Sequence, residues 1–210
     1  MPANARLRLI DPTNINQTVI STPRRGTNAG YRSREHLTED EVERLIKAAK
    51  ANRRGHRDGT MILLAFRHGL RVSELTGLRW EQVDLDSAIL HVRRVKSGTP
   101  STHPLTGREL RALRRLRRET GSPSPFVFVS ERAAPFTVDG FAKMVQRAGV
   151  AAGLELKVHP HMLRHSCGFV LANAGVDTRA IQGFLGHRSI TNTTRYTELA
   201  PGRFNGLWKD

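Results

Sequence analysis

Five residues near the C-terminal end of the sequence have the types and spacing needed to attack a phosphodiester. His161, Arg164 and His165 fall within about one helical turn, and His187 and Tyr196 follow. Residues three apart share a helix face, so His161 and Arg164 are expected side by side. A guanidinium can bind two phosphate oxygens, an imidazole can exchange a proton near neutral pH, and a phenol can serve as a nucleophile. The combination indicates chemistry on a phosphate ester.

Two residues from earlier in the sequence would complete such a site. The pentavalent phosphorus transition state gains negative charge, so a second arginine is expected beside the first, and Arg71 is a candidate. The leaving oxygen needs a proton, which Lys96 in a predicted hairpin turn could donate. Each residue also has a simpler interpretation. Arg71 could form a structural ion pair with Glu74, a hairpin lysine often serves solubility, and Tyr196 could be a packing residue.

Four segments in this order resemble the tyrosine recombinase family, also called the phage integrases. They are HGLRVSELTGLRWEQVDL around Arg71, HMLRHS around Arg164, LGH at 185–187, and Tyr196 nine residues after His187. The resemblance covers about residues 37–199. It implies an α+β fold that is mainly helical, namely a tyrosine recombinase catalytic domain with a small three-stranded antiparallel sheet at one edge.

The resemblance also implies a role for each candidate residue. Arg71 and Arg164 would clamp a DNA phosphate while Tyr196 attacks it and forms a 3′-phosphotyrosyl link. His161 would be a proton carrier, His187 a hydrogen-bond donor to the phosphate and Lys96 a general acid. Glu74 and His165 would be supporting residues. The covalent link stores the bond energy, so strand rejoining would need no cofactor, metal ion or ATP. The outcome would be inversion, integration or excision of DNA.

Composition points to the same kind of partner. Lys and Arg number 34 and Asp and Glu 19, which gives a net charge of +15, and the isoelectric point is about 11.4. Such a charge favours a polyanion, with double-stranded DNA as the leading candidate. A single cysteine, Cys167, excludes an internal disulfide and a cysteine-based zinc cluster. The longest apolar run, 61–66, is too short to span a membrane, and no signal-peptide core follows Met1, so a cytoplasmic location is expected.

Hydrophobic periodicity and turn residues divide the chain into three parts. We expect a basic, flexible arm at 1–36, a catalytic domain at 37–199 and a C-terminal tail at 200–210. Thr38 and Glu41 form a capping-box pattern at the start of the first helix. Within the domain we expect helices at 38–53, 58–67, 105–118, 137–152, 160–174, 177–185 and 190–196, and strands at 88–95, 102–105 and 126–129.

The expected helix at 105–118 carries an unusual density of arginine. Its leucines form an apolar stripe, and arginines fill the other faces. These arginines could contact the DNA backbone or form a solvated surface, and the sequence favours neither. The candidates for DNA contact are Arg108, Arg111, Arg114, Arg115, Arg118 and, after the LGH segment, Arg188.

The chain is short for the family it resembles. Most members carry a helical core-binding domain before the catalytic domain, whereas only 36 residues precede the predicted domain here. In this respect it resembles the short fimbrial-switch recombinases. Self-association into a dimer or tetramer on paired DNA sites is expected, with the apolar residues of the tail as a docking segment. An accessory DNA-bending or core-binding protein is a further expected partner.

Three other interpretations remain open at this stage. Residues 177–196 could form a helix–turn–helix of a transcription regulator without catalysis. His159, His161 and His165 could bind zinc in a hydrolase, although the sequence has no H-E-x-x-H motif. A type IB topoisomerase uses a similar set of residues, but the spacing from LGH to the tyrosine favours a recombinase.

Overall fold

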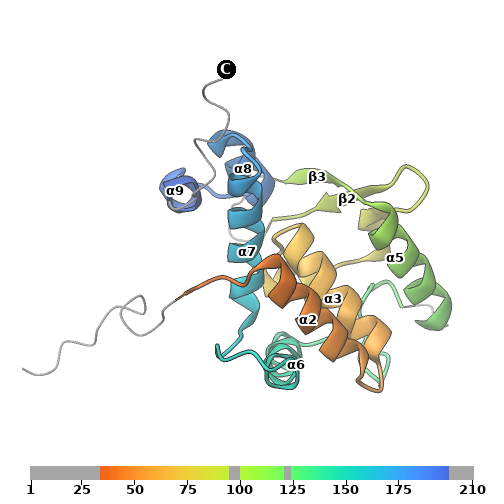
Figure 1. The fold of residues 1–210 in the computed structure, drawn as a ribbon. Helices are drawn as coiled ribbons and strands as arrows, with labels where there is room; N and C mark the ends of the chain where they lie inside the picture. The colour runs from red at the N-terminus through yellow and green to blue at the C-terminus, as the bar shows by residue number, and fades with distance from the viewer. Residues whose placement is uncertain (1–33, 95–99, 121–123, 199–210) are drawn as a thin grey trace, which may run out of the picture. The chain divides into compact units, whose positions relative to one another are not determined.

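The computed structural model describes residues 34–94, 100–120 and 124–198. Residues 1–34 and 35–210 form separate units, and apart from Arg34 every described residue belongs to the second. Lys96, nearly all of the expected arm and the expected tail therefore lie outside the described residues. Figure 1 shows the fold.

The folded region begins with two packed helices, α2 (Glu39–Lys50) and α3 (Gly55–Arg67). The predicted capping box is confirmed, because the Thr38 hydroxyl accepts from the Glu41 N–H and the Glu41 carboxylate accepts from the Thr38 N–H. Helix α3 starts three residues before its predicted beginning, and its 61–66 segment is buried. It ends at Arg67, and Gly69, two residues later, turns the chain with a φ of 55° that suits glycine.

The remaining helices lie close to their predicted positions. A short helix α4 (Val72–Thr76) and a 3₁₀ turn (Trp80–Gln82) precede the sheet. The later helices are α5 (Gly107–Thr120), α6 (Val138–Ala151), α7 (Pro160–Asn173), α8 (Thr178–Leu185) and α9 (Thr191–Glu198). None of the described helices is both long enough and apolar enough to cross a bilayer.

The sheet has three antiparallel strands, as predicted, but one of them is not the predicted strand. Its order is β1 (Val83–Asp84), β2 (Ile89–Val92) and β3 (Ser101–Pro104). The strand prediction at 126–129 is wrong, because this segment makes only isolated bridges, Arg79 to Phe126 and Val129 to Pro135. Val127 and Phe128 are nevertheless fully buried. Their apolar character reflects burial in the core rather than strand pairing.

Two apolar clusters hold the elements in place. The larger contains the buried faces of α2, α3 and α6, the sheet and the start of α7. The smaller joins the C-terminal half of α7 to α8 and α9, and consists of Cys167, Phe169, Ala172, Ile181, Leu185 and Tyr196. In Figure 1, α7, α8 and α9 lie together, while α5 lies beside the sheet on the far side of α3. Three helices from the C-terminal half thus form one corner of the domain.

Candidate active site

Arg71 lies at the N-cap of α4, immediately after the sharp turn at Gly69. Its Nη1 donates to Oε1 of Glu74 at 2.8 Å, and its backbone N–H donates to Oε2 at 2.9 Å. The Arg71 side chain is 27% exposed, whereas that of Glu74 is 2% exposed. The ion pair considered as a structural alternative is therefore present, but it leaves part of the Arg71 side chain open to solvent.

Helix α7 places His161 and Arg164 on one face, as their spacing predicts. Pro160 begins the helix, where the absent N–H costs nothing. Arg164 is 2% exposed, and its guanidinium donates to the backbone oxygens of Gly69 and Leu185, the latter at 2.6 Å. Arg164 thereby joins the turn before Arg71 to the end of α8, and fixes the distance between them.

Tyr196 lies on α9 and packs against α7. Its hydroxyl lies 3.0 Å from Nδ1 of His165, and its ring stacks edge-on against Phe169. A Cβ on Gly168 would approach the Tyr196 ring to 2.7 Å, so only glycine leaves room for the ring in this position. The residue assigned a supporting role, His165, is thus the direct partner of the expected nucleophile.

His187 completes this corner after the left-handed turn at Gly186. Its Nδ1 lies 2.9 Å from the hydroxyl of Thr193, and its ring is stacked with Tyr196 at 6.2 Å between centroids. The φ of 65° at Gly186 ends α8 and turns the chain back toward α7. Four of the sequence candidates, His165, His187, Arg164 and Tyr196, therefore share one cluster, and His161 contacts it through its ring packing on His165.

The electrostatics of the cluster keep its titratable groups neutral around the positive arginines. Burial and then the Arg164 charge lower the pKa of His187 to about 4, and burial lowers that of His165 to about 3. His161 is an exposed residue, yet its desolvation beside Arg164 still lowers its pKa. Burial raises the pKa of Tyr196, against the opposing charge of Arg164. At pH 7 the site holds neutral imidazoles, a neutral phenol and charged guanidiniums.

One buried cation was not identified from the sequence. Arg94, just beyond β2, donates to Oε2 of Glu74 at 2.8 Å and to the backbone oxygen of Phe184. Burial alone would raise the pKa of Glu74, but the Arg71 N–H and the two guanidiniums hold it below its usual value. The only available signal was a polar residue inside a predicted strand, which is weak in a chain this rich in arginine.

A second buried network, also missed, connects α3, β3 and α5. His68 lies 2.9 Å from the Glu109 carboxylate and 3.1 Å from the ring of His103, and both histidines are buried. The His103 ring stacks on Phe184 of α8 at 3.9 Å. Burial lowers the pKa of His103 to about 3. His68 lies 35 positions before His103 and still further from Glu109 and Phe184, so no short sequence motif could have predicted the network.

Comparisons with known proteins identify the family of this chain. The model of the Phage integrase family matches residues 35–203. The chain belongs to this family. It is 44% identical over 184 residues to the type 1 fimbriae regulatory protein FimB of Escherichia coli K12, covering 86% of this chain and 92% of that protein.

Solved structures show the same fold. The crystal structure of XerA recombinase gives a TM-score of 0.70 at 32% identity, over 80% of this chain and 62% of that one. A lambda integrase dimer bound to a COC′ core site gives 0.65 at 22% identity, over 83% and 50%. The mainly helical fold with its small antiparallel sheet is confirmed. The chain is a site-specific tyrosine recombinase, an enzyme that cleaves and rejoins DNA strands.

The two other classes of function considered from the sequence, a transcription regulator and a zinc hydrolase, are not supported. A helix–turn–helix at 177–196 would leave the segments around Arg71 and Arg164 unexplained, whereas the family match spans residues 35–203 and includes both. Within the described residues, no three His, Cys, Asp or Glu side chains are placed to hold a metal ion. His159, His161 and His165 therefore do not form the ligand set that the zinc alternative requires.

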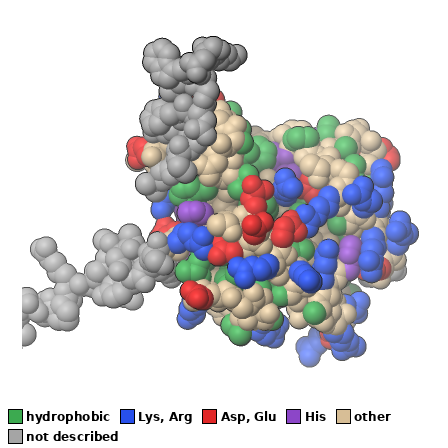
Figure 2. Space-filling view, in the orientation of Figure 1, with side chains coloured by type: hydrophobic (Ala, Val, Ile, Leu, Met, Phe, Trp, Pro, Cys, Tyr) green, Lys and Arg blue, Asp and Glu red, His purple; other side chains and the backbone are tan. Residues whose placement is uncertain are grey.

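The arginines proposed for DNA contact differ in their surroundings. Lys and Arg side chains gather over the region of α5 in Figure 2. Arg108 is held by the Glu43 carboxylate, and Arg115 pairs with Glu119 at 2.6 Å. Arg114 donates to the backbone oxygen of Leu85. Arg111, Arg118 and Arg188 are exposed, and no ion pair of theirs is found among the described residues.

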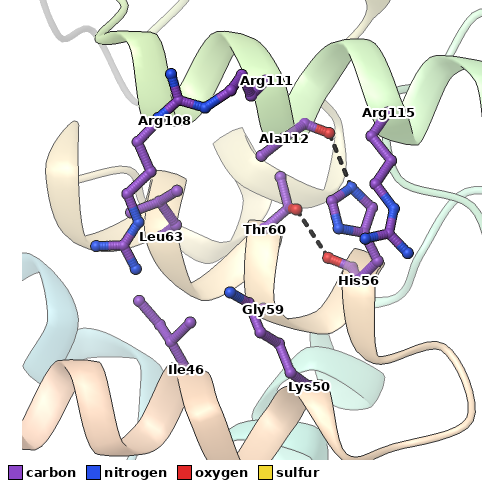
Figure 3. A pocket seen from close by; sticks show the side chains of 10 residues that line it. All are labelled: Ile46, Lys50, His56, Gly59, Thr60, Leu63, Arg108, Arg111, Ala112 and Arg115. Carbon is purple, nitrogen blue, oxygen red and sulfur yellow. Dashed lines mark hydrogen bonds between the residues drawn. The ribbon is translucent and has the colours of Figure 1, made fainter.

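The same helix borders a basic hollow of about 370 Å³ between α2, α3 and α5. Figure 3 shows Arg108, Arg111 and Arg115 on one side of it and Lys50 on the other. Its apolar lining is formed by Ile46, Leu63 and Ala112. Contact between α5 and the DNA backbone stays a prediction for this recombinase.

Proposed function

We propose that Tyr196 of this recombinase attacks the scissile phosphate and forms a 3′-phosphotyrosyl link. The bond from phosphorus to the phenol oxygen forms as the bond to the 5′ oxygen breaks. The observation that carries the proposal is the gathering of Tyr196, His187, His165 and Arg164 in one cluster. Burial, and then the nearby Arg71 charge, lower the pKa of Arg164. A nucleophile, imidazoles and guanidiniums gathered in this way are the groups that phosphoryl transfer needs.

Each neighbouring group then has a defined task. Arg71 and Arg164 bind the non-bridging oxygens and offset the charge that develops on them. His161 takes up the phenolic proton, and His187 donates a hydrogen bond to the phosphate. Lys96 supplies the proton that the departing 5′ oxygen requires. Glu74 and His165 hold Arg71 and Tyr196, respectively, in place.

The proposed substrate is double-stranded DNA with paired recombination sites, and the proposed outcome is inversion of the segment between them. The likeness to FimB over nearly its whole length supports a short recombinase of the fimbrial-switch type. We also propose that two or four copies assemble on the paired sites, as the lambda integrase in the compared structure is a dimer on its core site. A plasmid with inverted sites flanking a marker would test inversion directly.

The test of the nucleophile is Tyr196→Phe, which removes the oxygen and keeps the ring. The substrate is a duplex carrying the recombination site with a nick just beyond the scissile phosphate, so that the cut strand diffuses away. The wild-type protein should accumulate a covalent adduct that maps to Tyr196. The variant should bind the duplex with unchanged affinity and form no adduct. An adduct formed by the variant at the wild-type rate, or one that maps to Tyr31, would refute the proposal.

A further inference from the structure

Arg94 lies between two parts of the active site, α4 and the end of α8. Its side chain is fully buried, with 0% exposed, and it contacts Glu74 of α4 and the backbone oxygen of Phe184 in α8. Glu74 is the partner of Arg71, and Phe184 precedes His187 by three residues. Arg94 also stands two positions before Lys96 in the sequence. A single side chain therefore connects the segment that carries Arg71 to the segment that leads to His187.

The Glu74 carboxylate is shared between two guanidiniums. Oε1 accepts from Arg71, while Oε2 accepts from the Arg71 N–H and from Arg94 at 2.8 Å. The group of three carries one negative and two positive charges, a net charge of +1. Without Arg94 the Arg71 charge would be balanced by a buried carboxylate. In a site shielded from water, that balance would weaken the attraction of Arg71 for a phosphate.

The packing around Arg94 is fitted to this position. A Cβ on Gly186 would lie 2.8 Å from Cγ and Nε of Arg94, so the glycine that ends α8 also makes room for the arginine. The last carbonyls of a helix lack partners within it and favour cations. Here Arg94 binds the carbonyl of Phe184, and Arg164 binds that of Leu185. The end of α8 is thus bound by Arg94 and by Arg164, which is one of the two arginines proposed to bind the phosphate.

We infer that Arg94 is a positioning residue for strand cleavage: it neutralises Glu74, so that Arg71 keeps its charge for the phosphate, and it fixes the end of α8 that leads to His187. This inference rests on the proposed role of Arg71 at the scissile phosphate. It adds a residue that touches neither the DNA nor the nucleophile and acts through Glu74 and Phe184.

The test measures the rate of adduct formation by the full chain on the nicked duplex, at saturating protein. Arg94→Met should lower the rate about 100-fold or more, the size of effect that follows loss of one charge-stabilising group, with DNA affinity within a few-fold. Adding Glu74→Gln to Arg94→Met should restore the rate at least tenfold, because it removes the charge that Arg94 offsets. Arg93→Met is the matched control, since Arg93 is 71% exposed and pairs with Glu81 at the surface. It should cleave at nearly the wild-type rate.

A neutral substrate separates the charge effect from a general loss of structure. With a methylphosphonate at the scissile position the linkage carries no charge, so the ratio of wild-type to Arg94→Met rates should shrink at least tenfold. If the methionine variant does not fold, the neutral but polar Arg94→Gln replaces it, with the same expected rescue by Glu74→Gln. Wild-type cleavage by folded Arg94 variants would overturn the inference, as would absence of rescue in both the double variant and the methylphosphonate. Failure of the wild-type protein itself to form an adduct would refute the proposed nucleophile, and the role of Arg94 with it.

Discussion

The hydroxyl of Tyr196 and Nδ1 of His165 lie 3.0 Å apart, inside a cluster where both groups are neutral at pH 7. Tyr196 is 1% exposed, and its ring is enclosed by Phe169, His187 and the backbone of Gly168. A phosphate in solution cannot reach a hydroxyl buried to this extent. If Tyr196 is the nucleophile, as proposed, α9 must shift before cleavage so that the phenol leaves His165 and meets the DNA.

Gly168 should determine how firmly Tyr196 is held. Gly168→Ala places a methyl group 2.7 Å from the ring, so the ring must move, and α9 should lose part of its packing on α7. We expect destabilisation of about 1–3 kcal/mol and faster amide exchange in residues 191–198. Exchange followed by mass spectrometry and urea unfolding would measure both.

The matched control is Gly183→Ala, in the helix α8. No atom lies within 4 Å of a Cβ at Gly183, and the helix favours alanine. This variant should be neutral or more stable by up to about 1 kcal/mol, with unchanged exchange in α9. Equal exchange in the two variants would mean that Gly168 does not seat the tyrosine.

Acid should destabilise the domain before any carboxylate titrates. The folded pKa of His165 and of His103 is about 3, below the ordinary value of 6.5. Between these values the unfolded chain binds more protons than the folded chain, so stability is complete above pH 6.5 and falls as pH decreases toward 3. Each histidine contributes a slope of up to about 1.4 kcal/mol per pH unit. Urea unfolding at pH 7 and pH 5.5 would measure the change.

Substitution identifies the groups responsible for the acid effect. His103→Gln should reduce the pH slope by about one proton, because it removes a buried imidazole. His91→Gln, on the neighbouring strand, is the control, since His91 is exposed and its loss should leave the slope as it was. An unchanged slope in the His103 variant would place the titrating group elsewhere.

Binding of DNA should depend steeply on salt and unequally on the arginines of α5. With six or more phosphate contacts the slope of log K against log salt should be about −5 or steeper. Replacing Arg111 and Arg118 with Ala should make it shallower by about 2, since both are exposed. Arg108→Ala should change it less, because Glu43 already balances Arg108. Equal slopes in all three proteins would assign this helix to the solvated surface.

The sequence predicted most of what depends on short-range pattern. Thr38 with Glu41 predicted a helix start, and Gly69 and Gly186 predicted helix ends. The spacing in HMLRHS placed His161 and Arg164 on one face of α7. It could not predict contacts formed between distant segments. Arg94 is one of 34 basic residues, and its burial depends on contacts with Glu74 of α4 and Phe184 of α8, which are far from it in sequence. Likewise the two-residue strand β1 is too short to show an alternation, whereas the buried 127–128 segment imitates a strand without pairing as one.

Lys96 offers a chemical test of the proposed general acid. Lys96→Ala should slow adduct formation by about 10²–10⁴ and leave DNA binding nearly unchanged, because a general acid acts on the leaving 5′ oxygen and not on the bound ground state. A substrate with sulfur in place of that oxygen has a leaving group that needs no proton. The variant should cleave the sulfur substrate at close to the wild-type rate on the same substrate. Rapid-quench measurements on both substrates with both proteins give the four rates. If the variant stays slow on the sulfur substrate, Lys96 supports the site in another way and the acid is a different residue.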